Sequence, residues 1–203
     1  MGIAATERAE LSDLLEQLGP QAPTLCAGWQ TRQLAAHLVL REHRIDAQPG
    51  IVLSALAGYT AKVQDEIAAW PWQRLVDTVR GGPPWWSPFR LAPDALNGAE
   101  YLVHHEDVRR GGEDWEPRPA DATRDKLALG TLRRMGRTLL RGKASGLRLC
   151  TPDGHIALEI PGPGVLTITG EPVELLLFAF GRDATRLHFD GDIDAIRGLR
   201  RGL

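Results

Sequence analysis

Glu100 and His104 are the two residues whose types and spacing point most directly to chemistry. Residues four apart on an α-helix lie one above the other, with Cβ atoms roughly 5–6 Å apart. The pair would therefore offer a carboxylate oxygen and an imidazole nitrogen to one point beside the helix, which is half of a metal site. Such pairs also occur by chance as exposed charge pairs, so the spacing alone leaves both interpretations open.

His37 is the candidate for the other half of the site. It shares a stripe with Leu38 and Arg41 in a helix predicted over 31–44, so we expect it to face the core. A single core-facing histidine is more often hydrogen-bonded to a neighbour than bound to a metal. A divalent cation would, however, remove the cost of burying the Glu100 carboxylate in a helical core. Two histidines and one glutamate form a three-ligand set that suits a catalytic ion with open positions.

Four further residues each have a functional and a structural interpretation. Asp107, three positions after His104, would either accept a hydrogen bond from that imidazole or be a solvated helix carboxylate. Cys26 has no basic neighbour in the sequence to lower the pKa of its thiol, so we expect it to pack in the core. Trp85 and Trp86 would line a pocket mouth or cover the end of the helices.

The composition is that of an ordinary soluble globular protein. The 203 residues are 43% hydrophobic and 25% charged, with a net charge of −2. This charge indicates no general attraction to nucleic acid or anionic membrane, and no apolar run approaches the roughly 18 residues of a membrane span. The sequence starts without a signal-peptide pattern, and the widely separated Cys26 and Cys150 predict no disulfide framework. We expect a reducing, cytoplasmic setting, with no nucleic acid partner and no membrane.

Hydrophobic spacing predicts helices first and strands afterwards. The predicted helices cover 6–18, 31–44, 51–69, 71–80, 94–110 and 122–142. From residue 147 the period changes to two, and the predicted elements are strands at 147–154, 155–162, 164–170 and 185–192, a buried helix at 172–182 and a closing amphipathic helix at 193–201. The fold class is therefore predicted as α+β, with a helical domain over 1–145 and a small α+β domain over 146–203.

Three motifs, spread in order over nearly the whole chain, carry a resemblance to a known family. Their residues are Gly28-Trp29 with Thr31 to Leu38, which includes His37; then Glu100, Val103, His104 and Asp107; and then Gly170-Glu171-Pro172, Glu174-Leu175-Leu176 and Gly181-Arg182. The pattern resembles the mycothiol-dependent maleylpyruvate isomerase family, part of the wider DinB-like metalloprotein superfamily. The first two motifs together are specific, and the third is moderately so.

The resemblance implies a DinB-like four-helix bundle followed by a small α+β domain. It implies that His37, Glu100 and His104 bind one divalent ion, with zinc favoured and nickel, iron or cobalt as alternatives. It also implies mycothiol as a thiol cofactor and an electrophilic small molecule as substrate. Arg182 would bind the cofactor or a substrate carboxylate, or would instead be a cation that satisfies the last carbonyls of a helix.

The function expected from these observations is a metal-dependent enzyme that uses a small thiol, of the isomerase or S-transferase type, or that activates a water. The alternative is a metal-binding or interaction protein without catalysis. A third interpretation has the His37, Glu100 and His104 side chains forming a metal-free hydrogen-bond network. The sequence names no catalytic residue, and it leaves monomer and dimer open.

Overall fold

The computed structural model describes residues 2–51, 53–91, 93–142, 146–162, 164–191 and 199–202. Chain contacts divide the protein into two compact units, Met1–Glu116 and Pro117–Leu203. The described part of the first unit is built from helices, and the second unit combines helices with strands. The protein is therefore an α+β protein, as the sequence predicts.

The division lies earlier in the chain than the domain boundary predicted at 145. Helix α6 (Ala122–Leu139) packs against α7 (Pro172–Ala179) and against a strand of the sheet, so it belongs to the second unit. The change from helical to strand spacing marks the end of α6, whereas the division between the units falls in the polar segment before this helix.

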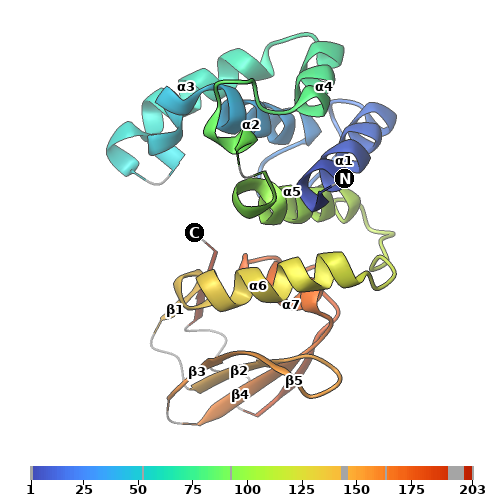
Figure 1. Ribbon diagram of the computed structural model, residues 1–203, viewed down its shortest axis with the longest axis vertical. Coiled ribbons are helices and arrows are strands. Elements are labelled where there is room, and N and C mark those ends of the chain that lie inside the picture. Colours follow the sequence, from blue (N-terminus) through green and yellow to red (C-terminus); the bar gives the residue numbers. More distant parts are fainter. Residues whose placement is uncertain are drawn as a thin grey trace. The chain divides into compact units, whose positions relative to one another are not determined.

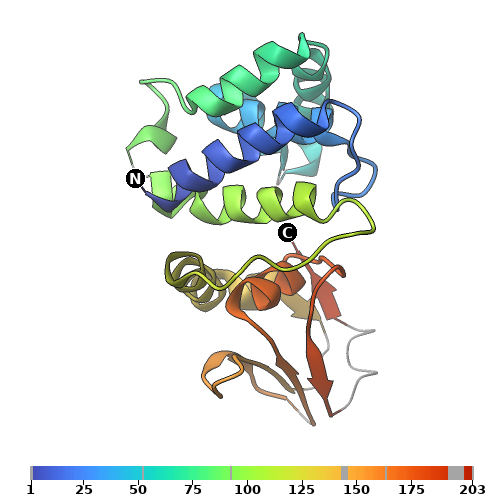
Figure 2. The ribbon, with the colours of Figure 1, turned by 90° about the vertical axis from the view of Figure 1, so that its right-hand side faces the viewer.

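The first unit carries the site residues. Its α-helices are α1 (Ile3–Leu18), α2 (Thr31–His43), α3 (Ala57–Ala68), α4 (Trp72–Gly81) and α5 (Pro93–Arg109), and its 3-10 turns are η1 (Ile45–Ile51), η2 (Ser54–Leu56) and η3 (Pro88–Arg90). Helix α1 runs along α5, and α2 contacts both α3 and α4 (Figures 1 and 2). The end of η1 and the whole of η2 occupy the start of the helix predicted over 51–69, so α3 begins later than the spacing suggests.

The core of the first unit is formed by leucines spaced three or four positions apart. Leu11 and Leu15 of α1, Leu34 and Leu38 of α2, and Leu75 of α4 are at most 1% exposed. Complete burial of one such side chain is worth about 1.5–3 kcal/mol relative to leaving it in water. This core therefore holds α1, α2 and α4 together.

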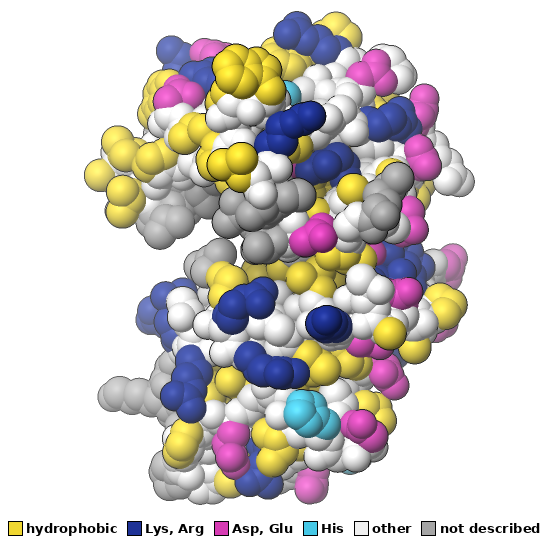
Figure 3. All heavy atoms as spheres, in the orientation of Figure 1, with side chains coloured by type: hydrophobic (Ala, Val, Ile, Leu, Met, Phe, Trp, Pro, Cys, Tyr) yellow, Lys and Arg dark blue, Asp and Glu magenta, His cyan; other side chains and the backbone are white. Residues whose placement is uncertain are grey.

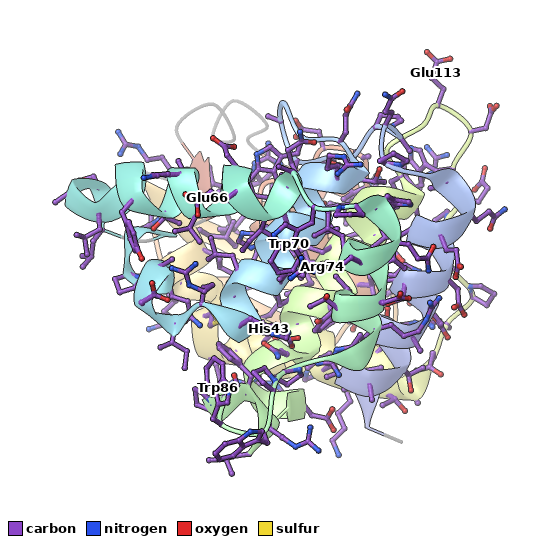
Figure 4. The ribbon with its side chains drawn as sticks, turned by 90° about the horizontal axis from the view of Figure 1, so that it is seen from above. His43, Glu66, Trp70, Arg74, Trp86 and Glu113 are labelled. Atoms are coloured by element: carbon purple, nitrogen blue, oxygen red, sulfur yellow. The ribbon has the colours of Figure 1, made fainter. Side chains whose placement is uncertain are left out.

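The junction between α3 and α4 is closed by a proline and an aromatic contact. Pro71 precedes α4 and cannot continue α3. The guanidinium carbon of Arg74 lies 3.8 Å from the centre of the Trp70 ring (Figure 4). This cation–π contact ties the first turn of α4 to the end of α3.

The second unit is a sheet with helices on one face (Figures 1 and 2). Its strands β2 (Gly146–Cys150), β3 (Ile156–Ile160), β4 (Val165–Thr169) and β5 (His188–Asp190) lie in the order β3-β2-β4-β5. Strands β2 and β3 form the predicted antiparallel hairpin, β4 pairs parallel with β2, and β5 pairs antiparallel with β4. Helix α7 is buried on nearly all sides, as expected from its continuous apolar run.

Two segments of the second unit differ from the prediction. The end of the predicted helix over 122–142 is strand β1 (Leu140–Gly142), which pairs antiparallel with β6 (Leu199–Arg201). The predicted closing helix over 193–201 is therefore wrong at 199–201, and 192–198 lie outside the described residues. Both errors have one cause, because a strand is stabilised by a partner distant in sequence and local spacing does not reveal that partner.

Candidate metal centre

Helices α2 and α5 bring the three predicted ligands to one point. Glu100 and His104 lie one turn apart on α5, and His37 projects from α2. Nε2 of His37 is 3.1 Å from Oε1 of Glu100, and Nε2 of His104 is 3.2 Å from the same oxygen. The three residues form a group whose donor atoms could hold a metal ion. His37 and Glu100, which are 63 positions apart in sequence, thus lie in contact.

The distances between these donor atoms fit a small divalent ion. In a tetrahedral shell with bonds of about 2.0–2.1 Å, neighbouring ligand atoms lie about 3.3 Å apart. The separations of 3.1 and 3.2 Å are close to this value. Two imidazole nitrogens and one carboxylate oxygen suit zinc, iron, cobalt or nickel rather than magnesium or calcium. The Glu100 side chain is 22% exposed, so one side of the group is open to solvent or to a further ligand.

Asp107 orients the imidazole of His104 from behind. Its Oδ2 lies 2.9 Å from Nδ1 of His104, and the carboxylate is fully buried. Asp107 is therefore not the solvated carboxylate that the sequence left open. Because Asp107 accepts the Nδ1 proton, Nε2 is the nitrogen that faces Glu100. A metal ion would bind this nitrogen in place of its proton.

The loop before α2 adds a thiol and an indole to this arrangement. The Cys26 thiol donates to Oδ2 of Asp107 at 3.2 Å and lies 3.9 Å from Nδ1 of His104. Gly28, with φ of +77°, allows the tight turn after Cys26. Trp29 then packs its ring 5.2 Å from that of His37. Cys26 is partly buried, as expected, but it also contacts the residue that orients His104.

Arg41 is a site residue that the sequence stripe contains but that we did not predict as functional. Its Nε lies 3.4 Å from Oε1 of Glu100, and Nη1 donates to Oδ1 of Asn97 at 3.0 Å. Its guanidinium carbon is also 5.1 Å from the centre of the Phe89 ring. Because Arg41 follows His37 by one helical turn, the spacing that identified His104 from Glu100 could also have identified it.

The electrostatics of the group favour an ionised Glu100. Burial lowers the pKa of His37, and its hydrogen bond with Glu100 opposes this only in part. Burial alone would raise the pKa of Glu100, but hydrogen bonds from His104 and His37 hold that pKa well below its usual range. Burial likewise opposes protonation of His104, yet contacts with Asp107, Cys26 and Glu100 raise its pKa well above the usual range. Glu100 is therefore a carboxylate at neutral pH, the form that binds a cation.

Other candidate residues lie elsewhere. Nδ1 of His105 is 2.7 Å from Oε2 of Glu7 on α1, so this histidine is not part of the ligand group. Arg182, in the second unit, donates from Nη1 to the carbonyl oxygen of Phe180 at the end of α7, 2.6 Å away. This contact is the one expected of a cation at a helix C-terminus. A role for Arg182 in binding a cofactor or substrate remains a prediction.

The fold and the site together define an α+β protein whose helical unit carries a two-histidine, one-carboxylate group open on one side. Two solved structures share this fold. One is the mycothiol-dependent maleylpyruvate isomerase, with 13% identity and a TM-score of 0.62 over 93% of this chain and 90% of that chain. The other, a histidine-to-alanine mutant with the same identity and coverage, has a TM-score of 0.63. No protein-family model and no curated protein sequence matches this chain. The resemblance expected from the motifs is confirmed at the level of the fold.

Proposed function

We propose that this protein is a divalent-metal-dependent enzyme that activates a low-molecular-weight thiol for attack on an electrophilic substrate. One observation carries the proposal, namely the convergence of His37, Glu100 and His104 within about one ligand–ligand distance. The shared fold with a mycothiol-dependent isomerase supports it. Thiol-dependent isomerisation and thiol S-transfer both begin with this activation, so we propose the class and not one reaction.

Each side chain of the group has a role in this proposal. His37 and His104 would bind the ion through Nε2, and Glu100 through a carboxylate oxygen, while Asp107 keeps the His104 ring in place. A divalent ion held there would lower the pKa of a bound thiol and so supply a thiolate at neutral pH. Arg41, beside Glu100, adds a positive charge that favours an anionic group at the open side.

The proposal extends to the components that the resemblance implies. We propose zinc as the ion, with nickel, iron or cobalt as alternatives, and mycothiol as the thiol. A DinB-like four-helix bundle for the helical unit, a cytoplasmic location, and a contribution of Arg182 to cofactor or substrate binding are further parts of the proposal. Among the described residues, no helix combines the length and the hydrophobicity that a membrane span requires.

Metal analysis of the purified protein tests the ligand group. We expect about one equivalent of metal in the wild type and at least a tenfold loss in His37→Ala, because removal of a ligand leaves two weak donors. His155→Ala, which removes an exposed histidine of the second unit, is the matched control and should keep its metal. Wild-type protein that takes up no metal would instead support the metal-free hydrogen-bond network.

The competing class is a metal-binding protein without catalysis. It predicts metal uptake but no heat on titration with mycothiol and no thiol-dependent turnover of electrophiles. Calorimetric titration of the metal-loaded protein with mycothiol therefore separates the two classes. Mycothiol binding that the wild type shows, and that His37→Ala loses together with the metal, would support the enzyme.

A further inference from the structure

A cavity of about 510 Å³ lies between α2 and α3, beside the ligand group. Its volume falls within the range of small-molecule binding sites, roughly 300–1,000 Å³. His37 lines the cavity, and the same side chain directs Nε2 toward Glu100. Trp29, whose ring lies 5.2 Å from that of His37, forms another part of the wall. A molecule in the cavity would therefore contact a proposed metal ligand.

Three of the polar side chains that line the cavity, those of Gln33, Gln64 and Asp65, have groups that are available to a ligand. The carboxamide of Gln64 and the carboxylate of Asp65 make no hydrogen bond or ion pair with any residue that the structure describes. Gln33 accepts a hydrogen bond from the backbone of Gln30 through Oε1, at 3.1 Å, which leaves its NH₂ group for a ligand. The cavity thus offers carboxamide donors, a carboxamide acceptor and a carboxylate.

The charge of the cavity restricts what it can bind. Asp65 is its one side chain with a permanent charge among the residues described, and that charge is negative. Carboxamides pair equally well with hydroxyl and amide groups, and the indole face packs against aliphatic rings or cations. Arg41, which contacts Glu100 and does not line the cavity, is instead positively charged. The cavity and the region near Arg41 therefore suit different reactants, the thiol and the electrophile respectively.

We propose that the cavity between α2 and α3 binds the non-reacting part of the thiol, and that this part carries hydroxyl, amide or ammonium groups and no net negative charge. The inference rests on the proposed function, because it assumes that the sulfur lies at the ligand group. It adds the location of the thiol's remaining atoms and the charge selectivity that the cavity would impose on them. The electrophile then occupies the side near Arg41.

A substitution that fills the cavity tests the location. Ala61 lines the cavity and is exposed on α3, so Ala61→Trp fills the space without disturbing the core. Glu66→Trp introduces the same ring at an exposed position of the same helix that does not line the cavity, and is the matched control (Figure 4). We expect the Kd of mycothiol for the cobalt-loaded protein to rise at least tenfold in Ala61→Trp and less than twofold in Glu66→Trp. Equal affinities for the two variants would overturn the inference.

2-Mercaptoethanol separates this inference from the proposed function, because it has almost no non-reacting part. A sulfur-to-cobalt absorption band should form with this thiol in the wild type and in Ala61→Trp alike. No band in the wild type would contradict the proposed function itself. A band in both proteins, with unchanged mycothiol affinity in Ala61→Trp, would contradict the cavity assignment alone. Mycothiol that binds the wild type no better than 2-mercaptoethanol would also contradict it.

The charge of Asp65 tests the class of thiol. Asp65→Asn should strengthen binding of the dianionic thiol mercaptosuccinate by about fivefold, because one repulsive charge near the surface is removed. Mycothiol, which is uncharged, should bind this variant within twofold of the wild type. An unchanged preference between the two thiols would overturn the predicted charge selectivity.

Discussion

Contacts behind the ligands decide how well the two imidazoles are oriented. His104 is held by Asp107, which the Cys26 thiol also contacts, and His37 packs against Trp29. These partners leave the Nε2 atoms of both histidines directed at Glu100. The residues that orient the ligands are therefore as specific a feature of the site as the ligands themselves.

Asp107→Asn tests this orientation at the residue scale. The substitution keeps the shape of the side chain but removes the charge that favours a protonated Nδ1 on His104. We expect metal affinity to fall about 10–100-fold, measured by competition with a coloured chelator. Asp77→Asn, at an exposed carboxylate of α4, is the control and should bind as the wild type does. An Asp107→Asn protein with wild-type affinity would show that Asp107 has only a structural role.

His43 should make stability depend on pH. Burial lowers its pKa below the ordinary 6.5, and a hydrogen bond with the backbone of Gly82 offsets part of this effect. Its Nε2 is buried and has no hydrogen-bond partner among the described residues. In the unfolded chain the ring gains its proton near pH 6.5, whereas in the folded chain it does so at lower pH. The contribution of His43 to stability is therefore fully present above about pH 6.5 and is lost as the pH falls from there through the lower pKa of the folded chain.

His43→Asn tests this pH dependence. The amide of the new side chain does not titrate and can keep the hydrogen bond with Gly82. Urea unfolding at pH 7.5 and pH 5.5 should show a smaller loss of stability in this variant than in the wild type. The same loss in both proteins would mean that other groups cause the pH dependence.

At the scale of elements, the end of α5 fixes the loop that carries Cys26. The amide of Leu25 donates to the carbonyl oxygen of Asp107 at 3.0 Å. Gly111, just after α5, lies against the backbone of Pro23 and Thr24, so closely that a Cβ atom there would overlap with Pro23. The close approach of this turn and the loop requires glycine.

Gly111→Ala should therefore destabilise the protein by about 1–3 kcal/mol, because two backbone segments would have to separate. Gly112→Ala provides a control one residue away, since a Cβ atom at Gly112 would meet nothing within 4 Å. We expect this control to change stability by less than about 1 kcal/mol. Denaturant unfolding measures both values, and equal effects of the two substitutions would contradict the proposed overlap.

At the scale of the whole molecule, the two units contribute different features. All three proposed ligands and the cavity belong to the first unit. In the second unit, the exposed side chains of Arg133, Arg134 and Arg137 form a basic face on α6 (Figure 3). We interpret this face as solvated, because the chain has a net charge of −2.

Metal removal should lower the stability of the intact protein. A ligand that binds only the folded state at about 100 times its Kd adds about 2.7 kcal/mol. Thermal unfolding with and without a chelator should show this difference in the wild type. Glu100→Gln should unfold at the same temperature with and without the chelator, because it lacks a ligand. A wild type that is insensitive to metal would contradict the proposed site.

The sequence by itself predicted the candidate ligand group, most of the helices and the strands of the sheet. His37, Glu100 and His104 were predictable because helical spacing is local and places residues on known faces. The tertiary structure decided the features that depend on partners distant in sequence. These are the pairing of β1 with β6, the division before α6, the contact of Cys26 with Asp107, and the cavity beside His37. Local periodicity predicts which face a residue lies on, but only packing determines what that face meets.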